Sequence, residues 1–328
     1  MFACPGCGAG LDFDVGSARC SGCAHEFEVE DGIPLLYWDN DWEAESADVT
    51  KDIRSFYEET PFPNYANLDD VAQLAHKAKQ GLFANLLDQQ IPPGSRIIEC
   101  GCGTGQLSNF LATTNRVVFG ADLCHNSLRL AEEFRAKNNL SNVRFLQMNL
   151  FRPAFKPGSF DLVISNGVLH HTSRPREAFA SISKLVKPGG YLLVGLYHRY
   201  GRLVTDARRV LFRLTGGAGR FLDPHLRKVE GNDAKYLAWY RDQYENPHES
   251  KHTIAEVSDW IDELGFEFVR SIPSAHLFQP FVEGTLLFAP EEPAVGAERM
   301  LAELGFALQG SREGGLFTVI ARRPETQL

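Results

Sequence analysis

Apolar and polar residues alternate along the chain with two periods, which predict strands and helices in turn. Short apolar runs, such as Ile97-Ile98, are typical of buried strands, whereas apolar residues three or four positions apart, as at Leu107, Phe110 and Leu111, are typical of helices. Strands that alternate with helices predict an α/β fold with a parallel sheet. The predicted strands are 97–99, 116–123, 143–147, one within 158–171, 186–197, 266–273 and 315–323, and the main helices between them are 126–139, 176–185 and 254–264.

A glycine-rich turn, ECGCGTG at residues 99–105, follows the first of these strands. Gly101, Gly103 and Gly105 allow the backbone to turn sharply and to approach a ligand closely. The spacing differs from the dinucleotide pattern, and no lysine follows as in a phosphate-binding loop. The strand instead ends on Glu99, whose carboxylate favours a cationic amino group over a pyrophosphate. The turn therefore predicts a cradle for a nucleotide that carries a cation.

This string resembles motif I of the class I S-adenosylmethionine (SAM) methyltransferases, and three further segments follow in the family's order up to about Tyr197. The resemblance implies a Rossmann-like, seven-stranded, doubly wound sheet that binds SAM. Asp122, 23 residues beyond Glu99, is then the expected partner of the ribose hydroxyls. Asn149 stands where the family usually has an aspartate on the adenine amino group, and its carbonyl can still accept that hydrogen bond. The implied cofactor residues are Glu99, Gly101, Cys102, Gly103, Gly105, Asp122, Leu123, Asn149, Leu150 and Asn166.

The first forty residues carry two Cys-x-x-Cys knuckles, Cys4 with Cys7 and Cys20 with Cys23. Four thiolates at this spacing predict a closed tetrahedral site for structural zinc, with two disulfides as the alternative. The segment also resembles the small zinc-ribbon activator subunit of tRNA, rRNA and protein methyltransferases, and the ribbons in front of bacterial rRNA methyltransferases. The resemblance implies a docking or recognition module.

Composition narrows the class of protein. The chain has 328 residues, 44% hydrophobic and 23% charged, which is ordinary for a soluble globular protein. No apolar run approaches a membrane span and no leader pattern opens the chain, so we expect a cytoplasmic protein. The net charge of −9 argues against a general nucleic-acid scaffold. We expect a zinc ribbon at 1–40, a linker and helical arm at 41–90, and a methyltransferase domain at 91–328 with a lid insertion at about 199–252.

Several side chains are candidates for acceptor chemistry. His170 and His171, at the end of the fourth strand, are the candidate general bases, although a structural role is the alternative. Aromatic residues of 53–65, followed by a helix predicted at about 69–87, either wall the pocket or fasten the arm to the domain. A second metal site beside the cofactor loops is a minor alternative, since small cysteines commonly pack there. These candidates are Tyr57, Phe62 and Tyr65 of the arm, and Cys100, Cys102, Cys124 and His125 for the metal.

The predicted lid contains a basic segment and an aromatic one. Residues 199–228 hold eight Lys or Arg against two Asp, and the apolar stripe from Leu203 to Leu214 predicts a basic amphipathic helix. Such a helix binds an anionic substrate, a membrane surface or RNA, or is merely solvated. The segment 236–252, with Trp239 and Tyr240, is the main candidate for covering the substrate. We therefore expect a SAM-dependent methyltransferase acting on a small molecule, with a tRNA or rRNA base methyltransferase and a catalytically silent SAM-binding partner as alternatives.

Overall fold

The N-terminal ribbon is continuous with the central sheet in the computed structural model, which describes residues 1–42, 48–63, 65, 68–217, 219–229, 231, 233–292, 294–308 and 315–325. Three antiparallel pairings connect the four ribbon strands, and the last of these strands then pairs in parallel with β7, Leu36 opposite Met148. Ile33 and Leu36 are fully buried, so the ribbon shares a core with the domain. The ribbon strands are β1 (Leu11–Asp14), β2 (Ser17–Cys20), β3 (Glu26–Glu30) and β4 (Ile33–Leu36).

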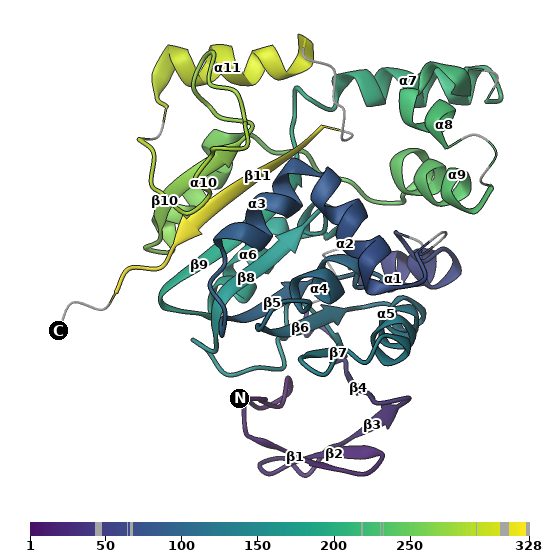
Figure 1. Cartoon of the computed structure of the whole chain (residues 1–328), viewed down its shortest axis with the longest axis vertical. Coiled ribbons are helices and arrows are strands. Elements are labelled where there is room, and N and C mark those ends of the chain that lie inside the picture. The colour runs from purple at the N-terminus through teal and green to yellow at the C-terminus, as the bar shows by residue number, and fades with distance from the viewer. Residues whose placement is uncertain are drawn as a thin grey trace.

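The remaining seven strands form the predicted Rossmann-like sheet, in the order β7-β6-β5-β8-β9-β11-β10 (Figure 1). Neighbours from β7 to β9 run in parallel, and β11 pairs antiparallel with both β9 and β10. The α/β expectation is confirmed. The strands are β5 (Arg96–Cys100), β6 (Val117–Asp122), β7 (Val143–Met148), β8 (Phe160–Asn166), β9 (Val186–Tyr197), β10 (Glu267–Ile272) and β11 (Leu316–Arg322).

Helices cover both faces of this sheet and divide the core into two layers. On one face, Leu86 and Phe110 pack with Ile97, and on the other, Phe179 and Trp260 share a cluster with Ile98. Successive strand residues thus point to opposite layers, as expected for a sheet buried on both sides. One layer contains α2 (Val71–Gln80), α3 (Leu82–Gln90), α4 (Gln106–Leu111) and α5 (His125–Lys137), and the other contains α6 (Pro175–Ser183) and α10 (Ile254–Glu263).

One helix prediction requires correction, and two further helices are present where none is predicted. The single helix expected at about 69–87 is two helices, because the backbone at Gly81 is extended between α2 and α3. Within the predicted linker and arm at 41–90, the structure adds α1 (Thr50–Glu59), although 43–47 lie outside the described residues. Between the last two predicted strands, where no helix is predicted, the structure has α11 (Gly296–Leu308), with 293 and 309–314 likewise outside the described residues. The alternating pattern of the central sheet was readable from sequence, whereas these short segments offered no comparable period.

The segment after β9, in which the lid is predicted, folds into short helices. It has a small core of its own, in which Phe212, Leu226 and Tyr244 are buried. None of the helices in the described ranges is both long enough and apolar enough to cross a bilayer. The lid elements are α7 (Leu203–Leu214), η2 (Arg220–Leu222), α8 (Pro224–Lys228), α9 (Asp233–Tyr240) and the π-helical turn η3 (Arg241–Glu245).

Candidate active site

A cavity of about 430 Å³ opens at the carboxyl ends of the parallel strands. This is the edge where open α/β sheets bind their ligands. Of the predicted cofactor residues, all except Gly105 line the cavity: Glu99, Gly101, Cys102, Gly103, Asp122, Leu123, Asn149, Leu150 and Asn166. Gly105 is instead the residue before α4, with φ +71°, and a side chain there would collide with Phe145 and Ala131. Its role is to let the helix start against the sheet.

The N-terminal arm lies directly across the glycine turn. Gly103 has φ +51°, and a Cβ on it would lie 2.3 Å from the carbonyl oxygen of Phe62. The Thr104 hydroxyl donates to the carbonyl of Pro63 beside this contact. Any residue larger than glycine at position 103 would push the arm off the turn, so this glycine positions the arm as well as the loop.

The arm is also tied down by Glu58 and Tyr65. The Glu58 carboxylate accepts from the backbone N–H groups of His125 and Asn126 at 2.8 and 2.9 Å, at the start of α5. The Tyr65 ring stacks on Phe134, with centroids 4.7 Å apart, and lies outside the cavity, so of the three candidate wall residues it fastens the arm. Tyr57 and Phe62 line the cavity.

Two carboxyl groups, the buried Glu99 and the partly buried Asp122, define the electrostatics of the end of the cavity beside the glycine turn. Burial, opposed by hydrogen bonds from Ser108, raises the pKa of Glu99 to about 8, and the Ser108 hydroxyl donates to its Oε2 at 2.5 Å. Asp122 accepts from the N–H groups of Gly103 and Cys124 at 2.7 and 2.8 Å, and burial raises its pKa as well. Within the described part of the chain, neither carboxyl has an ion-pair partner. A cationic ligand would relieve the cost of ionising them.

The amide of Asn149 joins the cavity to the ribbon. Its Nδ2 donates to the carbonyl of Trp38 and to Oδ1 of Asn40, both at 2.8 Å, and its Oδ1 accepts from the N–H of Phe151 at 3.1 Å. One lone pair of Oδ1 is therefore left to accept the hydrogen bond from the adenine amino group that the sequence predicts. Two residues that follow the last ribbon strand, Trp38 and Asn40, thus hold part of the cavity wall.

The opposite end of the cavity is polar and aromatic, and β9, the arm and η3 build it. The Tyr57 hydroxyl donates to Asp242 Oδ1 at 2.7 Å, and Gln243 Nε2 donates to Asp242 Oδ2 at 2.8 Å and to the Tyr197 hydroxyl at 2.9 Å. Burial and then the charge of Asp242 raise the pKa of Tyr57 well above its usual value, so Tyr57 remains a donor. The π-helical turn brings the adjacent residues Asp242 and Gln243 to the cavity together.

His170 and His171 form a hydrogen-bonded chain whose tautomers follow from their partners. The N–H of Tyr197 donates to Nδ1 of His170 at 3.3 Å, so Nε2 of His170 carries the hydrogen and points to Nε2 of His171 at 3.1 Å. His171 Nδ1 in turn faces the carbonyl of His248 at 2.9 Å. Burial lowers the pKa of both imidazoles. His171 lines the cavity and His170 does not, yet neither has a ring nitrogen free to take a proton. The geometry favours the structural alternative for this pair.

The lid contributes two aromatic rings to the cavity. Trp239 and His225 line it, with ring centroids 3.8 Å apart, whereas Tyr240 packs outside it in the lid core. Trp239 Nε1 donates to Asp223 at 3.2 Å, and Asp223 also caps α8. The lid candidate Trp239 therefore covers the cavity, held by a buried carboxylate.

The four ribbon cysteines form a cage in which all the sulfur atoms lie within 4.8 Å of one another. Cys4 and Cys23 Sγ are 3.8 Å apart, and Cys7 and Cys20 Sγ 3.4 Å, near the edge of about 3.8 Å of a zinc–thiolate tetrahedron. Backbone N–H groups, first that of Cys23 and then that of Gly22, lower the pKa of Cys20 to about 6. The cage fits zinc. Among the described residues no second cluster of this kind surrounds Cys100, Cys102, Cys124 and His125.

Sequence reasoning missed Asp242, Gln243 and Tyr197. Tyr197 closes the fifth predicted strand, so the rule that places ligands at strand ends could have found it. Asp242 and Gln243 lie in the predicted lid, but their approach depends on a π-helical turn that has no sequence signature.

Residues 98–194 match a family model described as a methyltransferase domain. The chain is 27% identical over 198 residues to an uncharacterized protein of Synechococcus sp., covering 53% of this chain and 48% of that protein. It is 32% identical over 139 residues to the ubiquinone biosynthesis O-methyltransferase of Ralstonia nicotianae, covering 40% of this chain and 58% of that enzyme. The chain thus spans about half the length of the curated relatives it matches.

A solved complex that contains the Trm112 methyltransferase activator of Haloferax volcanii has a similar fold. It matches with a TM-score of 0.50 and 15% sequence identity, covering 84% of this chain and 99% of that one. At this identity the likeness shows the fold alone.

Proposed function

We propose that the protein is a class I SAM-dependent methyltransferase that transfers the methyl group of SAM to a small-molecule acceptor, and the match of residues 98–194 to a methyltransferase domain supports this proposal. The observation that carries the proposal is the single cavity that runs from Glu99 and Asp122 to Tyr57 and Asp242. One end has the carboxyl groups that suit an amino acid and a ribose, and the other has rings and hydrogen-bonding groups for an acceptor. Donor and acceptor would share one enclosed space.

At the cofactor end, Glu99 would bind the amino group and Asp122 the ribose hydroxyls. Gly101, Cys102 and Gly103 would lie against the methionine part, and Leu123, Asn149, Leu150 and Asn166 would surround the remainder of the ligand. When bound, the cofactor supplies a sulfonium methyl group whose positive charge disperses on transfer. Because both partners would already be aligned, proximity alone could lower the barrier by several kcal/mol.

At the acceptor end, Tyr57, Tyr197 and Trp239 would form the walls, and Asp242 is the best-placed proton acceptor. Its carboxylate is buried and receives hydrogen bonds from Tyr57 and Gln243. An acceptor hydroxyl or amine that enters beside Tyr57 could pass its proton to this carboxylate. In this role Asp242 replaces the histidine pair, whose ring nitrogens already have partners.

The ribbon would hold one structural zinc ion through Cys4, Cys7, Cys20 and Cys23. Its sulfur cage is closed and leaves no position for a substrate. The contribution of the metal would be to fold the ribbon, because a unit of about forty residues is too short to build a self-sufficient core.

The test is incubation of the protein with methyl-labelled SAM and a cell extract, followed by separation into metabolites, RNA and protein. We expect the label in the metabolite fraction, and expect Asp122→Ala to abolish it. Label in the RNA fraction would favour the tRNA or rRNA enzyme. The absence of both label transfer and S-adenosylhomocysteine would favour the catalytically silent SAM-binding partner.

A further inference from the structure

Helix α7 of the lid presents its apolar side to solvent. Leu203, Val210 and Leu214 are 52%, 56% and 81% exposed, and Ala207 between them is exposed too. These residues are spaced i, i+4, i+7 and i+11, so they form one stripe along the helix. Most surface helices of soluble proteins place this stripe against the core, whereas α7 does the reverse.

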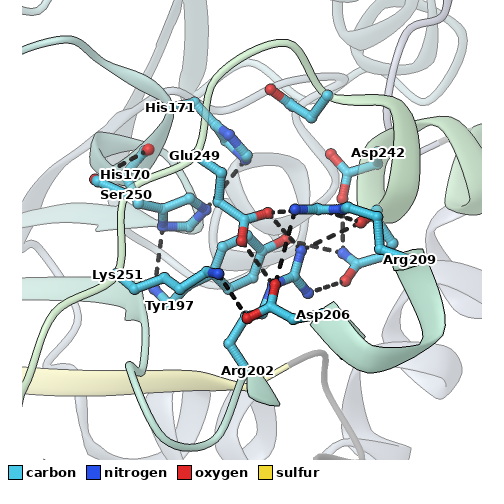
Figure 2. A network of polar contacts seen from close by, with 12 residues as sticks. His170, His171, Tyr197, Arg202, Asp206, Arg209, Asp242, Glu249, Ser250 and Lys251 are labelled. Carbon is cyan, nitrogen blue, oxygen red and sulfur yellow. Dashed lines mark hydrogen bonds and ion pairs between the residues drawn. The ribbon is translucent and has the colours of Figure 1, made fainter. Parts of the chain in front are cut away.

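Two arginines explain this orientation, because Arg202, which directly precedes α7, and Arg209 within it are anchored inside the protein. Arg202 is fully buried and donates from Nε and Nη2 to Glu249 at 3.0 and 2.6 Å, and Arg209 Nη2 donates to Glu249 at 2.8 Å (Figure 2). Burial alone would raise the pKa of Glu249, but Arg202 and then Arg209 lower it to about 2. Glu249 is therefore ionised and holds the helix by its cationic side.

Among the described residues of α7, η2 and α8, the exposed charges all have one sign. Arg213, Arg227 and Lys228 are exposed on α7 and α8. The two acids of these helices and their connection are engaged: Asp206 pairs with Lys251 at 2.6 Å, and Asp223 is buried under Trp239 and Tyr244. The surface between α7 and α8 also exposes Phe221 at 65% and Leu222 at 43%. We call these exposed residues of α7, η2 and α8 the lid face.

We propose that the lid face binds the surface of an anionic phospholipid bilayer. The apolar stripe would enter the boundary between headgroups and acyl chains, and the three cations would meet the lipid phosphates. A second copy of the chain is a poorer occupant, because pairing two such faces would bring cations together. RNA is also poorer, because it offers no partner for a continuous aliphatic stripe.

A second helix at the same end of the molecule as the lid face supports a bilayer on that side. In Figure 1, α7 and α11 lie at the end opposite the ribbon. Helix α11 also exposes apolar side chains there: Met300, Leu301 and Leu304. The lid that carries this face also covers the cavity with Trp239 and His225. A bilayer on the lid face would therefore place the acceptor end near a membrane-borne molecule, a consequence that rests on the proposed function.

The test is flotation of the full chain with vesicles of phosphatidylcholine alone and of phosphatidylcholine with phosphatidylglycerol. Each cation near an anionic surface strengthens binding about fivefold, so we expect roughly hundredfold tighter binding to the anionic vesicles. The pair Val210→Ser and Leu214→Ser should weaken it by about tenfold or more. The matched control is Val15→Ser, a fully exposed apolar residue of the ribbon, which should leave binding unchanged.

Vesicle binding requires neither cofactor nor turnover, so its result is independent of the proposed function. Absence of binding to anionic vesicles, or equal binding by the Val210 and Leu214 variant, would overturn the proposal. So would a solution dimer that the same variant disperses, which would assign the face to a second copy. Salt-sensitive RNA binding lost in Arg213→Gln with Arg227→Gln would assign it to RNA instead.

Discussion

The raised pKa of Glu99 makes a quantitative prediction about cofactor binding and pH. Burial raises this pKa to about 8, so at neutral pH the empty site holds mostly the protonated carboxyl. A cationic amino group is bound well only by the carboxylate. Binding of SAM should therefore release a proton from Glu99, and the affinity should rise with pH up to about 8, where the amino group of SAM begins to lose its own proton.

The size of the effect follows from the pKa. At pH 6, about two units below this pKa, about 1% of the Glu99 side chains are ionised. The dissociation constant of SAM should then be about 100-fold larger than that of the site with Glu99 ionised. The change is about tenfold, or 1.4 kcal/mol, for each pH unit up to about 8. At pH 7 about one proton should be released for each SAM bound.

The assay is titration calorimetry with SAM from pH 6 to 9, in two buffers whose heats of protonation differ. The matched variant is Ser108→Ala: the Ser108 hydroxyl bond lowers the pKa of Glu99, so loss of this one bond should move the rising part of the affinity profile to higher pH. Glu99→Gln should bind weakly with little pH dependence. An affinity that stays constant between pH 6 and 8 in the wild type, with no proton released, would refute this role for Glu99.

Three further outcomes are expected. In the absence of ligand and between pH 4.5 and about 8, Glu99 keeps its proton in the folded chain but has lost it in the unfolded chain. The free energy of unfolding should therefore fall as pH rises through this window. Because Glu99→Gln removes this titration, it should raise the free energy of unfolding at pH 7 by ~3 kcal/mol, measured by urea denaturation. Asp242→Asn should lower kcat by about 100-fold, whereas His171→Gln should reduce stability without shifting the pH profile of kcat/KM. An identical loss of kcat in both variants would contradict the assignment of Asp242 as the proton acceptor. Metal analysis should find one zinc per chain, and a chelator should unfold the ribbon and weaken SAM binding; a zinc-free protein with unchanged affinity would contradict this.

The central sheet and the cofactor end of the site could be predicted because each rests on a local pattern. Alternating periods predicted the strands from β5 to β11, and the strand-end rule located Glu99 and Asp122 beside the glycine turn. The acceptor end could not be predicted, since it depends on tertiary contacts between distant segments. Tyr57 and Asp242 are 185 positions apart, and only the folded lid brings them to 2.7 Å.

The histidine pair and α7 illustrate a second limit, which is that sequence does not show which way a side chain faces. His170 and His171 lie where an acceptor would enter, but their neighbours on the chain do not reveal that Tyr197 and His248 occupy their nitrogens. The stripe of α7 was visible, yet the usual inference would have buried it. Its exposure follows from Glu249, 47 positions beyond Arg202, which draws the arginine side inward.

The ribbon supports part of the cavity wall, because Trp38 and Asn40 hold the side chain of Asn149. Strand β4 pairs with β7, and Leu36 lies opposite Met148, the last residue of β7. Asn149 follows Met148 directly. The amide of Asn149 is then fixed by the backbone of Trp38, whose ring lies so close to Gly6 that a Cβ there would be 2.7 Å from it. Gly6 belongs to the first cysteine knuckle, so one line of direct contacts runs from the thiolate cage to the cavity. A change in the cage would therefore reach Trp38 through direct contacts, and the cavity wall around Asn149 would respond to it.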